Sequence, residues 1–244
     1  MAWDPPLMPI LCEPNNTLKN LLLNFPTTEA AALNQKMLCI EAFPRSGNSY
    51  AALAITDLIT KDGKNSLDMD HAAVLQKLIH HTHQSEVVRQ SVLSNIPTIT
   101  ILRNPLDAIF STYRYYAGEK RVCELCDWWR QFYLQCLELA KYNHFRIIDF
   151  EDIKDSTRNL AKCLVSLKII RSLPIRSVPV ETVLNYIRNE DQKHGRHYEY
   201  RAAAPIDRNN RFREDFFSEF NKMPEVGESI QAIYQEVLRQ KMCL

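Results

Sequence analysis

Apolar residues along this chain fall into short continuous runs and longer stripes at helical spacing. Three runs, at residues 37–43, 98–102 and 145–150, are nearly continuous and as long as buried strands. Between them, apolar positions recur every three or four residues, as they do on one face of a helix. One such helix is expected at about 156–167. The two clearest helical stripes are Leu125, Trp128, Trp129, Phe132, Cys136 and Leu139, and Ile230, Ile233, Tyr234, Val237 and Leu238.

Strands that alternate with helices predict a parallel sheet covered on both faces, a three-layer α/β/α fold. In such sheets ligands bind beyond the carboxyl ends of the strands. Residues 44–49 and Arg103 come directly after two of the predicted strands. We expect one domain over residues 1–244, with an irregular lead-in at 1–35 and a helical C-terminal region at about 171–244.

Composition narrows the classes of protein that this chain can belong to. Its net charge of +1 offers no overall attraction for nucleic acid or an anionic membrane. No long apolar stretch or signal-like N-terminus occurs, so we expect a cytoplasmic protein that does not span a membrane. Seven irregularly spaced cysteines favour free thiols in a reducing compartment. Cys123 and Cys126 lack a second pair at zinc spacing, and we interpret them as small residues in the first turn of a helix.

The segment at residues 43–50, FPRSGNSY, joins a predicted strand to a predicted helix. Backbone N–H groups and the helix dipole favour an anion at such a junction. Gly47 permits a close backbone approach, and Arg45 adds a positive charge. The loop of nucleotide kinases is absent, because no lysine follows Gly47 and the first glycine of that motif is missing. The segment therefore predicts an anion site without the kinase lysine.

A second charged position follows the strand at 98–102. Arg103 ends this strand, and Asn104 and Pro105 then form a typical helix start. Ser111 lies about two turns into that helix and could join Arg103 on one anion. The alternative is that Arg103 pairs with Asp107 and that Ser111 only covers the helix surface.

Together the two segments resemble the motifs of sulfotransferases that use 3′-phosphoadenosine-5′-phosphosulfate (PAPS). Residues 44–50 are similar to P-[KR]-S-G-T-[ST]-[WL], and residues 103–111 are similar to R-N-P-x-D-x-x-x-S; the resemblance covers roughly 36–170. It implies a P-loop-like strand-turn-helix, a PAPS donor with PAP as product, no metal, and a small-molecule or glycan acceptor. By the same resemblance Tyr50 stacks on adenine, and Phe150 stands where the family often has tyrosine. The implied nucleotide-binding residues are Pro44, Arg45, Ser46, Gly47, Asn48, Ser49, Tyr50, Arg103 and Ser111.

Sulfuryl transfer to a hydroxyl needs a base, and histidine suits that role near neutral pH. The chain offers three candidates within four residues, His80, His81 and His83. The resemblance aligns His83 with the catalytic histidine of the family and His81 with its usual lysine. His80 is the alternative base, and a surface or metal-binding run is the alternative interpretation of the cluster. Arg45 would stabilise charge on the transferring and leaving groups.

Other interpretations remain open at this stage. A kinase-like phosphotransferase would use the same fold, and a non-catalytic PAP- or PAPS-binding protein would use the same nucleotide site. Residues 193–196, KHGR, are the nearest likeness to a C-terminal family segment that holds the 3′-phosphate. The sequence does not identify the acceptor. It also leaves open whether the protein forms a homodimer.

Overall fold

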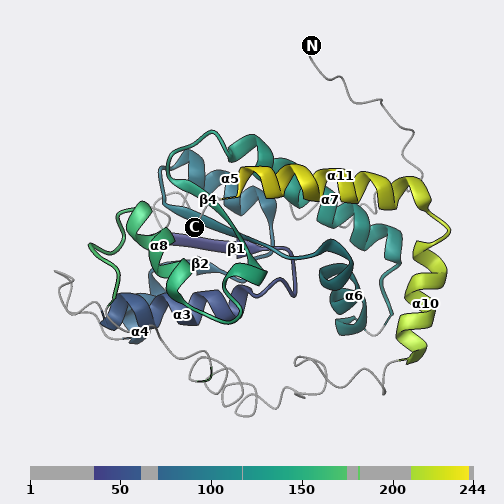
Figure 1. Cartoon of the computed structure of the whole chain (residues 1–244), viewed down its shortest axis with the longest axis horizontal. Coiled ribbons are helices and arrows are strands. Elements are labelled where there is room, and N and C mark those ends of the chain that lie inside the picture. Colours follow the sequence, from purple (N-terminus) through teal and green to yellow (C-terminus); the bar gives the residue numbers. More distant parts are fainter. Residues whose placement is uncertain (1–35, 62–70, 117, 175–180, 182–209, 242–244) are drawn as a thin grey trace, which may run out of the picture.

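A computed structural model of the chain describes residues 36–61, 71–116, 118–174, 181 and 210–241. These residues form an α/β fold in which helices cover both faces of a central sheet, as the sequence predicts (Figure 1). The expected irregular lead-in at 1–35 and the KHGR segment at 193–196 lie outside the described residues.

The central sheet has four parallel strands in the order β2-β1-β3-β4. Three strands match the predicted apolar runs to within a residue at each end, which confirms those predictions. The fourth, β2, was not predicted, because three residues are too few to show a pattern. The strands are β1 Leu38–Ala42, β2 Leu78–His80, β3 Thr98–Leu102 and β4 Phe145–Asp149.

Helices follow each strand, and their ends show the expected signals. The side chain of Asn104 accepts hydrogen bonds from the amides of Leu106 and Asp107, and Pro105 takes the first helical position of α6. The helix expected at about 156–167 is observed as α8. The helices are α3 Asn48–Lys61, α4 His71–Gln76, α5 Ser85–Leu93, α6 Pro105–Tyr115, α7 Val122–Leu139, α8 Arg158–Ser166, α10 Asn210–Phe220 and α11 Pro224–Gln240, with a short 3-10 turn at Phe150–Asp152.

Two apolar cores lie on opposite faces of the sheet. One joins the sheet to α3, α4 and α8, and the other joins it to α5, α6, α7, α10 and α11. In Figure 1, α3 and α4 of the first group lie below the sheet, and α7 and α11 of the second group lie above it. Both predicted stripes, on α7 and α11, pack in the second core, because each helix turns its apolar face toward the sheet or its neighbours. Within the part of the chain that the structure describes, no helix could cross a membrane.

The strand order places a reversal between β1 and β3. The chain leaves β1 to form β2 on one side, and then returns to form β3 on the other side of β1. Crossovers therefore diverge at the carboxyl ends of β1 and β3, the place where open α/β sheets bind ligands. The loop after β1 and the arginine after β3 lie at these two strand ends.

The described cysteine side chains take part in packing. The five described cysteines are free. Cys123 lies in the first turn of α7, as expected, whereas the more buried Cys126 lies at the start of the second turn. Burial raises the pKa of Cys126 to about 12, with the nearby Asp127 adding to the shift. A thiol of that pKa is protonated at neutral pH and is a poor metal ligand.

Candidate functional site

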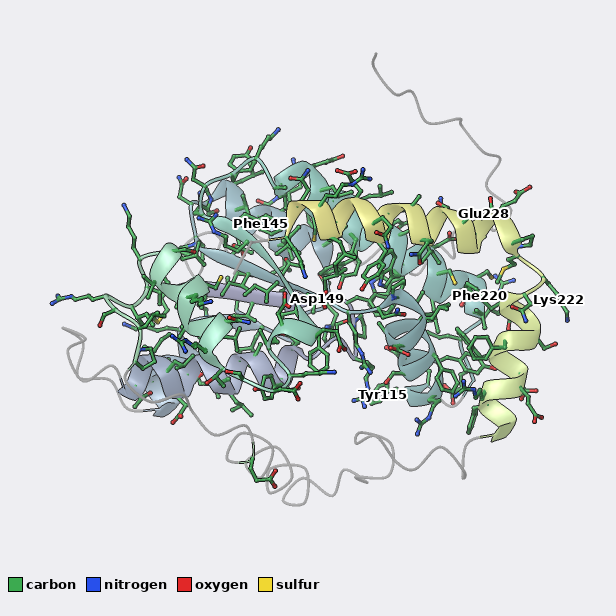
Figure 2. The ribbon with its side chains drawn as sticks, viewed as in Figure 1. Tyr115, Phe145, Asp149, Phe220, Lys222 and Glu228 are labelled. Atoms are coloured by element: carbon green, nitrogen blue, oxygen red, sulfur yellow. The ribbon has the colours of Figure 1, made fainter. Side chains whose placement is uncertain are left out.

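The predicted site residues follow the carboxyl ends of all four strands and so share one edge of the sheet. The β1–α3 loop, residues 43–47, follows β1, and the histidine segment, residues 80–83, begins at the end of β2. Arg103 follows β3, and Phe150 follows β4. Figure 2 labels two residues that border this edge, Asp149 at the end of β4 and Tyr115 at the end of α6.

The β1–α3 loop has the backbone of an anion-binding turn. Arg45 and Gly47 both have positive φ, 65° and 94°, and α3 begins directly afterwards. Among the described residues, the amides of Gly47, Asn48 and Ser49 donate no hydrogen bond. Amides at such a turn and at a helix N-terminus together favour a bound phosphate or sulfate.

Gly47 also has a packing role that the sequence did not reveal. A Cβ atom at this position would lie 2.5 Å from Cδ2 of Phe150, well inside contact distance. Phe150 in turn lies under the guanidinium of Arg103, whose Cζ is 5.4 Å from the ring centroid. The Phe150 ring therefore supports the loop and the arginine by packing.

Two arginines meet at the loop. Nη1 of Arg103 donates to the carbonyl oxygen of Arg45 at 2.7 Å, and Nε of Arg45 donates to the hydroxyl of Ser111 at 3.3 Å. Arg45 also lies over the ring of Tyr115, 5.8 Å from its centroid. The structure thus brings Arg45, Arg103 and Ser111 together, with Arg103 bonded to the loop rather than paired with Asp107. Both arginines therefore bring positive charge to this loop, and arginine is well suited to bind phosphate or sulfate groups.

The remaining loop residues take structural positions. The carbonyl oxygen of Pro44 accepts from the Thr112 hydroxyl at 3.2 Å, which joins the loop to α6. Ser46 and Asn48 are buried. The amide of Ser46 donates to the carbonyl oxygen of Phe43 at 3.2 Å, so of these two amides only that of Asn48 remains for a ligand within the described residues. The Ser49 hydroxyl is bonded to Nε2 of His81 at 2.7 Å.

Tyr50 lies away from the mouth of the loop. It is 6% exposed and packs in the core between the sheet and α3. Burial, and then the charge of Asp155, raises the pKa of Tyr50 to about 12. The described residues do not present this ring at the surface, and its stacking on adenine stays a prediction.

His83 has the tautomer that a general base requires. Its Nδ1 lies 2.8 Å from the carbonyl oxygen of Ala42, and a carbonyl oxygen only accepts, so Nδ1 carries the proton. In the neutral ring the lone pair is then on Nε2, which forms no hydrogen bond within the described part of the chain. The orienting bond comes from the end of β1, the strand that precedes the loop.

The other two histidines form a chain with Ser49. Nδ1 of His81 lies 2.6 Å from Nδ1 of His80, and its Nε2 faces the Ser49 hydroxyl. Burial, and then the charge of Lys36, lowers the pKa of His80, so this ring is neutral at pH 7. His81 is thereby bonded to the first turn of α3. The described residues contain no group of three potential ligands that could hold a metal ion.

Glu41 is the residue of this edge that sequence reasoning missed. It lies in β1, is 0% exposed, and accepts hydrogen bonds from the histidine segment and from Asn48. The available signal was a single carboxylate inside the otherwise apolar run LCIEA. A charge in a strand that is buried on both faces requires internal partners, and those partners identify its role.

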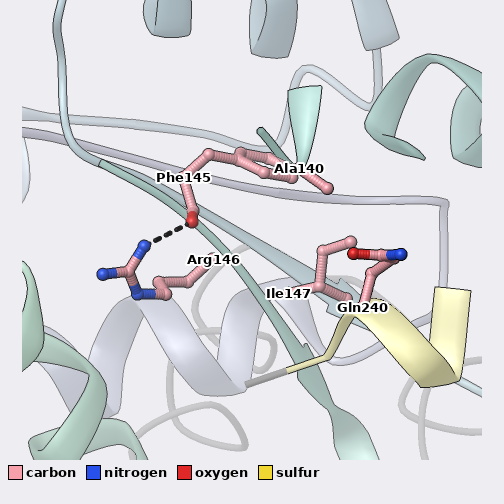
Figure 3. A pocket seen from close by; sticks show the side chains of 5 residues that line it. All are labelled: Ala140, Phe145, Arg146, Ile147 and Gln240. Atoms are coloured by element: carbon pink, nitrogen blue, oxygen red, sulfur yellow. Dashed lines mark hydrogen bonds between the residues drawn. The ribbon is translucent and has the colours of Figure 1, made fainter. Parts of the chain in front are cut away.

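A small cavity of about 160 Å³ lies away from this edge. Ala140, Phe145, Arg146, Ile147 and Gln240 line it (Figure 3). Arg146 donates there from Nη1 to the carbonyl oxygen of Phe145 at 2.8 Å. The cavity sits at the amino end of β4, opposite the strand ends that carry the predicted residues, and has no part in the candidate site.

Comparison with known proteins identifies no family for this chain. No protein-family model matches it, and a search of curated proteins likewise finds no match. The likeness of its two motifs to those of sulfotransferases stays a prediction, and the function has to be inferred from the site itself.

Proposed function

We propose that this protein is a PAPS-dependent sulfotransferase that transfers a sulfuryl group to a hydroxyl or amine of a small-molecule or glycan acceptor. The observation that carries the proposal is the meeting of Arg45, Arg103 and Ser111 at one loop, beside a histidine with the tautomer of a base. A cytoplasmic location belongs to the same proposal. The free described thiols suit that compartment.

The donor would be held from two sides. The amides of Gly47, Asn48 and Ser49, which donate no hydrogen bond to any described residue, and the charge of Arg45 suit the 5′-phosphosulfate. Arg103 and Ser111 suit the 3′-phosphate, the group that separates PAPS from ordinary adenine nucleotides. The donor set is cationic and rich in N–H groups, as a ligand with several anionic oxygens requires.

The acceptor would be activated by His83. PAPS supplies the sulfuryl group, and the acceptor oxygen or nitrogen forms a bond to its sulfur as the bond to the bridging phosphate oxygen breaks. Nε2 of His83 takes the acceptor proton, and the bond from Nδ1 to Ala42 holds the ring in place as it becomes cationic. Arg45 stabilises the negative charge that develops on the leaving phosphate, a role that requires charge positioned in advance.

A kinase-like phosphotransferase fits these residues less well. The position after Gly47 is Asn48, whose side chain is buried and bonded to Glu41, where a kinase loop has its phosphate-binding lysine. Arg103 follows β3, which pairs with β1. P-loop ATPases use a carboxylate to hold magnesium, and an arginine supplies none. A cation at that point favours a further phosphate group over a metal ion.

A non-catalytic nucleotide-binding protein would need the arginines and the loop but not an oriented base. The orientation of His83 therefore favours the enzyme over the binding protein. The decisive experiment measures transfer from ³⁵S-labelled PAPS to a panel of phenols, sugars and amines, with PAP, AMP and ATP affinities measured by calorimetry. We expect transfer to at least one acceptor class and PAP as the tightest of the three nucleotides.

His83→Ala tests the base within the same assay. We expect near-native PAP affinity and a turnover lower by about 10²- to 10⁴-fold, the usual contribution of a positioned base. His144→Ala is the matched control, since His144 also bonds to a backbone carbonyl, that of Val92 at 2.8 Å, but lies at the amino end of β4. Equal affinities for PAP and AMP would remove the PAPS assignment. Full activity of His83→Ala would move the base to His80 or to the acceptor itself.

A further inference from the structure

Glu41 connects the two halves of the candidate site. Its Oε1 accepts from the amide of Thr82 at 2.8 Å, and its Oε2 accepts from the amide of His83 at 3.0 Å. The same Oε2 accepts from Nδ2 of Asn48, the first residue of α3, at 3.2 Å. One carboxylate thus bonds both to the histidine segment and to the helix that begins after the β1–α3 loop.

The backbone of the histidine segment explains why such a partner is needed. His81 and His83 have φ values of 62° and 55°, in the left-handed region that residues with a Cβ adopt uncommonly. Two such residues around Thr82 persist only when surrounding bonds hold them. The bonds from Thr82 and His83 to Glu41 supply that constraint, because they tie both amides to a rigid central strand.

The carboxylate is well matched to its three donors. An ionised carboxylate only accepts hydrogen bonds, and bonds to a charged acceptor are stronger than neutral ones. Burial raises the pKa of Glu41, whereas the bonds from Thr82 and His83 oppose that rise. A buried carboxyl group is costly for a fold, and a residue retained for packing alone would be apolar.

We propose that Glu41 is a positioning residue that sets the place and ring orientation of His83 relative to the β1–α3 loop. It touches neither the donor nor the acceptor, and acts through the amides of the histidine segment and through Asn48. The bond from Nδ1 of His83 to Ala42 depends on this placement, since Ala42 is the next residue of the same strand. The role in turnover rests on the proposed function, whereas the role in orienting His83 does not.

Two substitutions of Glu41 remove its hydrogen-bond acceptors to different extents. Glu41→Met keeps similar length and removes all three acceptor bonds. Glu41→Gln retains one acceptor oxygen and should give an intermediate effect. Thr100→Val is the control, because Thr100 is the register partner of Glu41 on β3, is equally buried, and has no bond to the histidine segment.

The first measurement is the protonation pattern of the His83 ring by ¹⁵N NMR. We expect the proton on Nδ1 in the wild type and in Thr100→Val. In Glu41→Met we expect the His83 ring to exchange between both tautomers, as an unconstrained ring does. In Glu41→Gln we expect a fraction of the Nδ1 tautomer between those of the wild type and Glu41→Met. In the transfer assay, Glu41→Met should lose about 10- to 100-fold in turnover, the range for losing an orienting partner, with PAP affinity changed less. A His83 ring unchanged in Glu41→Met would overturn the proposal.

A second measurement needs no variant that has to fold. Amide hydrogen exchange in the wild type should show slow exchange at Thr82 and His83. Gln84 should exchange faster, since its amide has only the long 3.4 Å bond to the Thr82 hydroxyl. Equally fast exchange at all three amides would show that Glu41 does not hold the segment. Neither the NMR nor the exchange measurement depends on sulfuryl transfer. Both would therefore still test the role of Glu41 if the proposed function were wrong.

Discussion

Replacement of Gly47 by alanine probes the packing between the β1–α3 loop and the turn after β4. The substitution introduces two separate effects. The backbone has φ of 94°, which a residue with a Cβ adopts only under strain, and the new methyl group would lie 2.5 Å from Cδ2 of Phe150. Phe150 is half-buried and can yield only by leaving its place beneath Arg103.

The expected cost follows from these two effects. A left-handed backbone costs an L-residue about 1–2 kcal/mol, and overpacking by one methyl group costs about 1–3 kcal/mol. Alanine recovers about 0.4–1 kcal/mol by restricting the unfolded chain. The net loss of unfolding free energy is therefore between about 1 and about 4.6 kcal/mol, which is less than the ordinary stability of a domain, about 5–15 kcal/mol.

A double-variant cycle separates the two contributions. In a Phe150→Ala background the methyl group no longer meets the ring, so Gly47→Ala should cost about 1–3 kcal/mol less than in the wild type. Urea unfolding gives both values. Gly227→Ala is the control. Gly227 lies inside α11, where helix propensity favours alanine over glycine by about 1 kcal/mol. A Cβ atom added there would lie 3.3 Å from Cζ of Phe220, the last residue of α10.

The same variant should weaken nucleotide binding. The amide of Gly47 belongs to the proposed anion site, and we expect strain at this position to displace it together with the amide of Asn48. We expect lower PAP affinity for Gly47→Ala at a temperature where the protein is fully folded. A change in stability below about 1 kcal/mol, or the same cost in both backgrounds, would refute the packing argument.

Three further expectations concern charge. We expect the wild type to bind PAP at least about tenfold more tightly than AMP, a difference of about 1.4 kcal/mol in binding free energy. Arg103→Ala should abolish this preference, whereas the control Arg146→Ala should retain it. Calorimetry measures the affinities of both variants. Arg45→Ala should lower turnover at saturating PAPS more than it lowers PAP affinity, and an unchanged rate would exclude Arg45 from the transfer step. Because burial raises the pKa of Glu41 above its ordinary 4.5, the folded state binds this proton more tightly than the unfolded state. The unfolding free energy of the wild type minus that of Glu41→Gln should therefore fall as pH rises from 4.5 through the raised pKa, and a rise over that window would contradict the assigned shift.

Local sequence signals were sufficient for the secondary structure that frames the site. Strand β3 has the predicted bounds because its five residues are all apolar or β-branched and all buried. Helix α6 begins where expected because the cap of Asn104 and the ring of Pro105 act within one turn of chain. Gly47 was expected at a close backbone approach, and its positive φ is a local property of the turn.

The order of the strands required the tertiary structure. Each apolar run can pair with any other, and only packing across the whole sheet places β1 between β2 and β3. That order brings the loop after β1 beside Arg103, and joins residues that are 58 positions apart in the chain. The same packing takes Tyr50 into the core, because its place on α3 turns the ring toward the sheet.

The sequence by itself therefore predicted an α/β chain with a turn suited to an anion after one strand, an arginine after another, and a cluster of three histidines whose place in the sheet it did not show. These features depend on residue type and short-range spacing, which a sequence displays directly. The tertiary structure alone decided that Glu41 bonds to Thr82, His83 and Asn48 and that Phe150 packs on Gly47. Buried polar bonds and ring contacts depend on which distant segments meet, and that meeting is the outcome of satisfying every buried group at once.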